Sequence, residues 1–130
     1  MKILVIMSHK LTEGQKQELR QRFNAESFIN FPEHIKQQWM NIPPFGPWRN
    51  EFLQGIKEWL THQLEKGDKV IVQGEFGATF FLVYWLKKNG YEVYYATSER
   101  KVVEEVKPDG TVETSRRFQH VCFREYPDIN

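Results

Sequence analysis

The sequence contains a single cysteine, Cys122, among its 130 residues. One thiol cannot form an internal disulfide or a cysteine-rich zinc cluster, and no pair of histidines and acidic residues has the spacing of metal ligands. We therefore expect neither a metal site nor a cofactor. A chain of this length can bury roughly two-thirds of the surface it exposes when unfolded, so a hydrophobic core can stabilise it without crosslinks.

Long hydrophobic segments are also missing. The longest apolar run, residues 80–86, is far shorter than the roughly 20 residues that cross a bilayer. Met1 and Lys2 lead directly into a short apolar strand, without the pattern of a signal peptide. The sequence predicts a cytoplasmic protein that does not contact membranes.

The chain has no excess of charge of either sign. Its 18 basic and 17 acidic residues give a formal net charge of +1. Proteins that follow a long nucleic acid present an extended basic face, so this balance argues against a long nucleic acid as partner. A small or compact anionic ligand is compatible with it.

The sequence does have an alternation of short apolar strands and amphipathic helices. Continuous apolar runs at residues 2–7 and 69–73 are typical of strands buried on both faces of a parallel sheet, and residues 27–31, which stop at Pro32, and 91–96 are predicted as two further short strands. Helices are predicted at 12–23, 34–40, 50–65 and after a glycine turn at 74–79, and a stiff proline loop at 41–47. This order predicts an α/β fold with helices on both faces of a mostly parallel sheet.

The C-terminal segment has a different pattern. Residues 101–106 and 111–126 alternate polar and apolar side chains around a turn at 108–110, which predicts an antiparallel hairpin. We expect one domain over residues 1–130, with an alternating core at 1–98 and the hairpin at 99–130. On a regular strand, residues 116, 118, 120, 122 and 124 would share one side that could close over an anion.

Candidate binding residues follow the predicted strands, because ligands of open parallel sheets gather at the carboxyl ends of the strands. They are Ser8 and His9 after the first strand, residues 73–79 after the third, and Thr97, Ser98 and Arg100 after the fourth. Gly74 and Gly77 would allow close approach, and the free amides of the following helix favour a phosphate. The segment has neither a Walker A ending nor G-x-G-x-x-G spacing, so a purely structural turn is the alternative.

Individual side chains at this edge are open to two interpretations. His9 and His120 could transfer protons near neutral pH, or could have structural roles. A dyad of Ser8 with His9 is not expected, since adjacent side chains of a strand point to opposite faces. Glu75 would oppose a phosphate unless it points away or acts on a proton. The aromatic set Trp39, Phe45 and Trp48 could stack on a base, cover a partner subunit or fill the core.

Several segments together resemble a small family of CRISPR-associated proteins of type III systems, the Csx family number twenty. The matching segments are residues 8–9 with 11–12, Trp39 with 41–44, residues 72–79, residues 95–97 with Arg100, and residues 118–124. The resemblance runs nearly end to end, and its most specific part is the segment from Gln73 to Thr79. That family usually has aspartate where this chain has Glu75.

The resemblance implies a Rossmann-like domain similar to the CRISPR-associated Rossmann fold (CARF), acting as a homodimer on a cyclic oligoadenylate second messenger. It implies a ring nuclease whose expected substrate is cyclic tetra-adenylate. A ribose 2′-hydroxyl would attack the adjacent phosphate without a metal ion, and cleavage of the ring would end the antiviral signal. The protein would then supply geometry and charge.

The resemblance also implies a role for each matching residue. Gly74, Glu75, Phe76, Gly77, Ala78 and Thr79 would form the phosphate turn, and Gln73 would orient a ribose or base edge. Ser8 and His9 would contact the ring, and Thr97 and Arg100 would add hydrogen bonds and charge. His120 and Arg124 would contact the transition state or leaving group, with His9 favoured over His120 for proton transfer.

Two other functions stay compatible with the sequence. One is a module that sequesters the messenger without cleaving it, and the other is a single-stranded RNA-binding domain that stacks bases on Trp39 and Trp48. A homodimer is expected from the apolar residues 80–86 and the aromatic loop around Trp48, which would otherwise be exposed to water.

Overall fold

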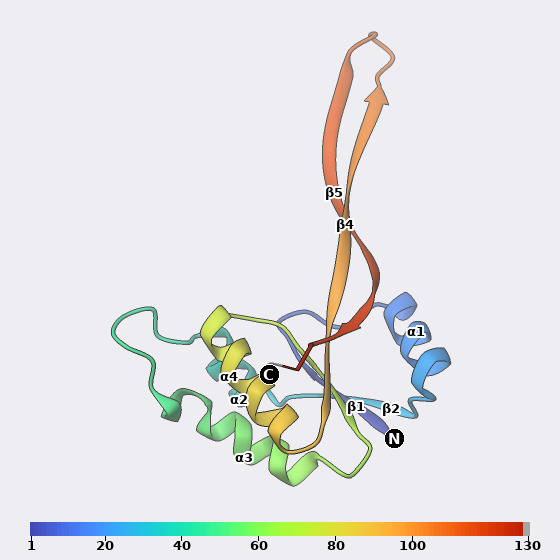
Figure 1. The fold of residues 1–130 in the computed structure, drawn as a ribbon. Coiled ribbons are helices and arrows are strands. Elements are labelled where there is room, and N and C mark those ends of the chain that lie inside the picture. Colours follow the sequence, from blue (N-terminus) through green and yellow to red (C-terminus); the bar gives the residue numbers. More distant parts are fainter. Residues whose placement is uncertain (129–130) are drawn as a thin grey trace.

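A computed structural model describes residues 1–128 as an α/β domain with a long projecting hairpin (Figure 1). One sheet has the strand order β2-β1-β3-β4-β5, formed by β1 (Lys2–Ile6), β2 (Ser27–Asn30), β3 (Lys69–Val72), β4 (Glu92–Val106) and β5 (Val112–Glu125). The first four strands are parallel and β5 is antiparallel to β4. The predicted α/β class and C-terminal hairpin are therefore confirmed.

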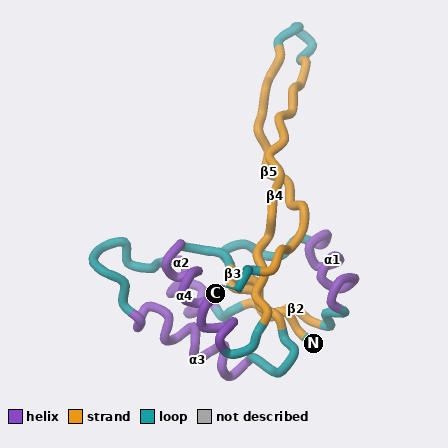
Figure 2. The backbone as a smooth tube through the Cα atoms, viewed as in Figure 1, coloured by secondary structure: helices purple, strands orange, loops and turns teal. Residues whose placement is uncertain are grey.

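Helices cover both faces of the sheet. Helix α1 (Glu13–Phe23) lies on one face, and α2 (Glu33–Met40), the 3-10 turn η1 (Asn50–Leu53), α3 (Gln54–Gln63) and α4 (Phe76–Lys88) lie on the other (Figures 1 and 2). Within residues 1–128, none of the helices has the length and apolar character needed to span a bilayer.

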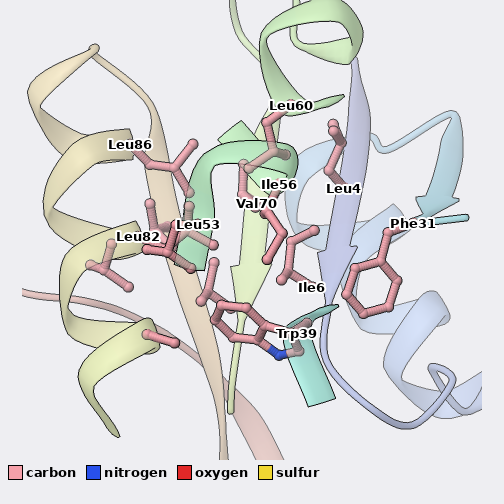
Figure 3. Packing of buried hydrophobic residues seen from close by; sticks show 14 of the residues in the cluster. Leu4, Ile6, Phe31, Trp39, Leu53, Ile56, Leu60, Val70, Leu82 and Leu86 are labelled. Carbon is pink, nitrogen blue, oxygen red and sulfur yellow. The ribbon is translucent and has the colours of Figure 1, made fainter. Parts of the chain in front are cut away.

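The core has two layers because β1 and β3 present alternate residues to opposite faces. Leu4 and Ile6 pack with Trp39 and the leucines of α3 and α4 (Figure 3). Ile3 and Val5 pack with Leu19 of α1 on the other face. Continuous apolar strands are thus buried on both sides, as their sequence predicts.

Helix α1 begins at the predicted capping box. The Thr12 side chain accepts a hydrogen bond from the Gln15 amide at 3.1 Å, and the Gln15 side chain accepts one from the Thr12 amide at 3.0 Å. The predicted helix at residues 50–65 is instead a 3-10 turn followed by α3, which ends at Gln63.

The main difference from prediction concerns β4. The predicted strands at 91–96 and 101–106 are one strand of 15 residues. No glycine or proline occurs between Tyr91 and Lys107, so nothing in the chain interrupts the extended backbone. The expected boundary near residue 98 therefore lies inside β4, and Thr97, Ser98 and Arg100 belong to the ladder with β5 instead of following the end of a strand.

Candidate functional site

The carboxyl ends of β1 and β3 lie side by side where the strand order changes direction, which is where open α/β sheets bind ligands. A pocket of about 800 Å³ opens at the carboxyl end of β3, between α4 on one side and β4 with residues 126–128 on the other; its lining among residues 1–128 includes no residue of β1 or of the loop after it. Of the predicted residues, it brings together Gln73, Gly74, Phe76 and Thr79. The other predicted site residues lie outside the pocket lining.

The wall contributed by α4 is a stripe at four-residue spacing. Phe76, Phe80, Tyr84 and Lys88 follow one another on the same side of the helix and line the pocket. Phe76 is 93% exposed, and Phe80 and Tyr84 are more than half exposed. The spacing is present in the sequence, but it is hidden within the apolar run at residues 80–86, because that run also contains the buried core residues Leu82, Val83 and Leu86.

The opposite wall comes from Tyr95 and residues 126–128, which the sequence pattern did not assign to the site. The rings of Tyr126 and Tyr95 pack in a tilted arrangement with their centroids 4.7 Å apart, and the Tyr126 hydroxyl donates to the Val72 carbonyl at 2.7 Å. Burial, and then the nearby Tyr95, raise the pKa of Tyr126 to about 12. Lys87 donates to the Tyr126 carbonyl at 2.8 Å and pairs with Asp128 at 2.9 Å, so α4 holds this wall in place.

Gln73 is fixed at the base of the pocket. Its side-chain oxygen accepts from the Ala96 amide at 2.7 Å, and its backbone carbonyl accepts from the Trp39 indole at 3.0 Å. Because the oxygen is used, the side-chain NH₂ is the group left to donate to a ligand. Thr79, in the first turn of α4, has a buried hydroxyl without a hydrogen-bond partner among residues 1–128. These are two polar groups without full protein partners at the pocket.

The two glycines of the predicted phosphate turn approach indole rings. A Cβ at Gly74 would lie 2.6 Å from the Trp39 ring, and one at Gly77 would lie 3.3 Å from the Trp48 ring. Trp39 is therefore a core residue, and Trp48 stacks on Phe81 at 5.0 Å, while Phe45 stays 86% exposed. The core-filling interpretation fits Trp39, and the three rings do not form one stacking platform.

Glu75 changes the expectation of a phosphate at the start of α4. It is the N-cap residue, and its carboxylate accepts the hydrogen bond of the Gly77 amide. A carboxylate at a helix N-terminus takes the place that an anion would otherwise occupy. Phe76, Gly77, Ala78 and Thr79 form the first turn of the helix, and Ala78 is fully buried.

Ser8 and His9 lie beyond the end of β1, at the same edge of the sheet as the pocket, and both are exposed. Their Oγ and Nδ1 atoms are 3.2 Å apart. The expectation that these side chains point to opposite faces was wrong, because the strand ends at Ile6 and the chain bends at residues 7–9.

His120 lies on the other face, against α1. The Gln15 side chain has its oxygen on the Thr12 amide, so its NH₂ group faces His120 Nδ1 at 3.2 Å as donor. His120 Nε2 then carries the proton and donates to Glu18 at 2.9 Å. Both ring nitrogens are occupied in connecting β5 to α1.

A β-bulge separates residues that were expected to share one side of β5. Thr97 pairs with Cys122 and Ser98 with His120, which leaves Val121 as an extra residue. The predicted set is therefore split: Arg116, Phe118 and His120 share one side, while Cys122 and Arg124 share the other.

The remaining predicted residues have local partners. The Thr97 hydroxyl donates to the Cys122 carbonyl at 3.0 Å, and the Arg100 guanidinium lies 5.4 Å from the Phe118 ring, on the projecting hairpin. Arg124 donates to the Tyr95 hydroxyl at 3.2 Å, which raises its pKa, and so lies beside a pocket residue without lining the cavity. Within residues 1–128, no group of three or more histidine, cysteine or acidic residues could hold a metal ion.

Comparison with known proteins identifies one family. The chain is 34% identical over 126 residues to the uncharacterized protein MJ1673 of Methanocaldococcus jannaschii, covering 96% of each sequence. No solved structure matches the chain. The model of the uncharacterized protein MJ1673 family matches residues 1–124, so this chain belongs to that family.

Proposed function

We propose that this domain binds a cyclic oligoadenylate, tested most directly with cyclic tetra-adenylate, in the pocket beside α4, and that it cleaves the ring without a metal ion. The observation that carries the proposal is the cavity of about 800 Å³ at the carboxyl end of β3, with aromatic walls. In this proposal the domain is a CARF-like relative that acts in the cytoplasm on the second messenger of type III CRISPR systems.

The lining of the pocket suits a nucleotide. Phe76, Phe80 and Tyr84 offer ring surfaces on which adenine bases can stack. The Gln73 NH₂ group can donate to ribose and base atoms, and the buried Thr79 hydroxyl can donate or accept once it rotates into the cavity. Such a site binds bases through flat apolar contacts and orients them with a few polar groups.

The phosphates would lie against side-chain cations. Glu75 already satisfies the Gly77 amide, so the helix N-terminus is a poor phosphate site unless Glu75 turns away. Lys88 continues the α4 stripe and lines the pocket, whereas the Lys87 ammonium is already paired with Asp128 at 2.9 Å. A ring with few phosphates needs only such local positive charge, which agrees with the net charge of +1.

The proposed chemistry uses the substrate's own nucleophile. A ribose 2′-hydroxyl gives its proton to a base as its oxygen attacks the adjacent phosphorus. The bond from phosphorus to the 5′-oxygen breaks and this oxygen takes up a proton, which leaves a 2′,3′-cyclic phosphate and a 5′-hydroxyl. His9 is the residue we assign to proton transfer, because it is exposed at the same edge of the sheet. His120 is excluded from this role because both of its nitrogens bind α1.

A turnover assay tests the proposal. Purified protein incubated in EDTA with a tenfold excess of labelled cyclic tetra-adenylate should convert the whole pool to linear products with a cyclic phosphate end. Recovery of an intact ring in a stoichiometric complex would leave the sequestering module as the function. Equal binding of linear oligoadenylate, with strong salt dependence, would favour the RNA-binding alternative, which the burial of Trp39 already weakens. Binding of none of these ligands would reject the proposal.

A pair of variants locates the site. Phe80→Ala should weaken binding of the cyclic ligand, because its half-exposed ring lines the pocket. Phe45→Ala is the matched control, since Phe45 is exposed but lies outside the pocket lining. Equal affinities for the two variants would place the ligand elsewhere.

A further inference from the structure

The β4–β5 hairpin projects far from the body of the domain (Figures 1 and 2). We call residues 98–119 the arm; nearly all of them are exposed. Strand β3 pairs with β4 only as far as Tyr94, so both outer edges of the arm are open within residues 1–128. A two-stranded hairpin alone is marginally stable in water, and open edges readily pair with another strand.

The pairing inside the arm places like charges opposite each other. Lys101 faces Arg117, and Glu105 faces Glu113. Like charges in directly opposite positions destabilise a ladder. Within residues 1–128 the arm contains one ion pair, Lys107 with Glu113 at 2.8 Å, so Lys101, Arg117 and Glu105 form no ion pair there. A neighbouring strand could supply opposite charges directly across from them.

The exposed edge of β4 carries such charges in a symmetric order. On one face of β4 the residues are Glu99, Lys101, Val103 and Glu105, and Lys107 follows directly after the end of the strand. A two-fold axis normal to a sheet pairs two copies of a strand in antiparallel fashion and keeps each side chain on its own face, so one residue must face its own copy. With Val103 at that position, Lys101 faces Glu105 of the partner subunit, and Glu99 faces Lys107 of the partner subunit.

We propose that the arm is a dimerisation element in which the β4 edges of two copies of this chain pair around Val103. The four strands then form one continuous sheet. Its central rows run Arg117, Lys101, the partner's Glu105 and the partner's Glu113, so two like-charged pairs become one balanced row of four. The proposal is independent of the proposed function, since it rests on the charges of the arm alone.

The other open edge and other partners explain the arm less well. Pairing of two β5 edges around Ser115 would bring Glu113 opposite Arg117 of the partner subunit, giving two opposite-charge contacts instead of four. A nucleic acid is disfavoured because the arm is not basic: Arg100, Lys101, Lys107, Arg116 and Arg117 are balanced by Glu99, Glu104, Glu105, Asp109 and Glu113.

Engineered disulfides test the register. In a Cys122→Ser background, Val103→Cys places two thiols opposite each other across the axis, at a Cα separation of about 4.5–5.5 Å that suits a disulfide. Mild oxidation should give a covalent dimer. Ser115→Cys is the matched control, because it would crosslink only if the β5 edges paired. Crosslinking of the control alone, or of neither variant, would overturn the proposal.

Charge reversal tests the contacts. Lys101→Glu should raise the dimer dissociation constant roughly 10- to 100-fold in sedimentation experiments, and Glu105→Lys should do the same, because each places like charges across the axis twice. Neither change weakens the arm itself, since each turns a like-charged pair within the chain into an opposite one. Mixing the two variants should restore a heterodimer with native affinity.

Arg117→Glu is the control for charge reversal. It changes the same charge at the same level of the arm, but on the outer strand, so it places no like charges directly opposite each other across the axis and should raise the dimer dissociation constant less than tenfold. A wild-type protein that is monomeric at 100 µM, a dimer unaffected by Lys101→Glu, or a failure of the mixture to associate would each overturn the proposal.

Discussion

At the scale of single residues, Asp68 is the one charged side chain that is fully buried within residues 1–128. Its carboxylate accepts hydrogen bonds from the Lys2 side chain at 2.6 Å, the Lys2 amide at 3.1 Å and the Glu65 amide at 2.9 Å. Burial alone would raise the pKa of Asp68, but these hydrogen bonds outweigh it and hold the pKa below its ordinary value. The group thus anchors the start of β1 to the turn before β3.

We predict that Asp68→Asn lowers the free energy of unfolding by about 1–3 kcal/mol at pH 7, because the Lys2 ammonium loses its buried partner. A carboxyl with a lowered pKa stabilises the fold above its unfolded pKa of 3.8 and loses this effect as the pH falls through the lower folded value. Urea denaturation of both proteins at pH 7 and pH 3 should show the difference shrinking in acid. A difference that grows in acid would contradict this account.

Thr79 separates ligand binding from stability. Its buried hydroxyl has no partner among residues 1–128, so Thr79→Val, which keeps the shape, should leave the free energy of unfolding unchanged or slightly higher. If the hydroxyl binds the ligand, Thr79→Val should lower the affinity for cyclic tetra-adenylate roughly 2- to 13-fold. This range corresponds to the loss of one hydrogen bond that contributes about 0.5–1.5 kcal/mol. Calorimetric titration and thermal unfolding of the same samples measure both. Unchanged affinity would remove Thr79 from the site.

The two histidines should behave in opposite ways. His9→Ala should slow single-turnover cleavage about 10²–10⁴-fold, the range of general acid–base assistance, with little change in stability because the side chain is exposed. His120→Ala should cost about 1–2 kcal/mol of stability, because Glu18 and Gln15 lose a partner, and should leave the rate of the folded protein near wild type. Single-turnover rates and unfolding curves of both variants distinguish these effects. A large loss of rate in His120→Ala, with a loss of stability in His9→Ala, would exchange the roles of the two histidines.

At the scale of elements, local sequence signals located most strands and helices but misjudged continuity. The capping box at Thr12 and the apolar runs of β1 and β3 act through neighbouring residues, and they were predictable for that reason. The length of β4 and the bulge at Val121 depend on pairing with a strand many positions away. The same bulge moved Arg124 and Cys122 away from the side of the hairpin on which His120 lies.

We predict that Thr12→Ala destabilises the domain by about 0.5–2 kcal/mol, because the Gln15 amide loses its acceptor at the start of α1. Thr61→Ala is the matched control: its hydroxyl donates to the Lys57 carbonyl within the exposed face of α3, and its loss should change stability by less than about 0.5 kcal/mol. Chemical denaturation compares the two. A larger effect at Thr61 would show that capping does not limit the stability of α1.

At the scale of the whole molecule, the domain divides into a packed body and an arm with little buried surface. Phe118 is 71% exposed and Val106 is 72% exposed, while Phe123, five residues after Phe118, is 1% exposed in the body. Amide exchange reports such differences, because segments with few buried contacts open at low cost in free energy.

We predict that arm amides exchange quickly at protein concentrations below the dimer dissociation constant and become protected above it, with the largest change along residues 99–107 of β4. Amides of β1 and β3 should stay protected at both concentrations, because they lie in the centre of the sheet. Hydrogen exchange with mass spectrometry at 0.5 and 100 µM, with Lys101→Glu as the monomeric reference, checks this. Protection confined to the amides of β5 would instead favour a dimer in which two β5 edges pair.

The α/β class and the antiparallel C-terminal hairpin were predictable from the sequence, and the carboxyl end of β3 was predicted as the place of a ligand site. These follow from local periodicity and from the strand-to-helix turn at Gln73, which need no knowledge of distant contacts. Only the tertiary structure decided the partners of each side chain. Gly74 and Gly77 approach indoles, Glu75 caps its own helix, and His120 binds α1, because side chains far apart in the sequence occupy the space that a ligand was expected to fill.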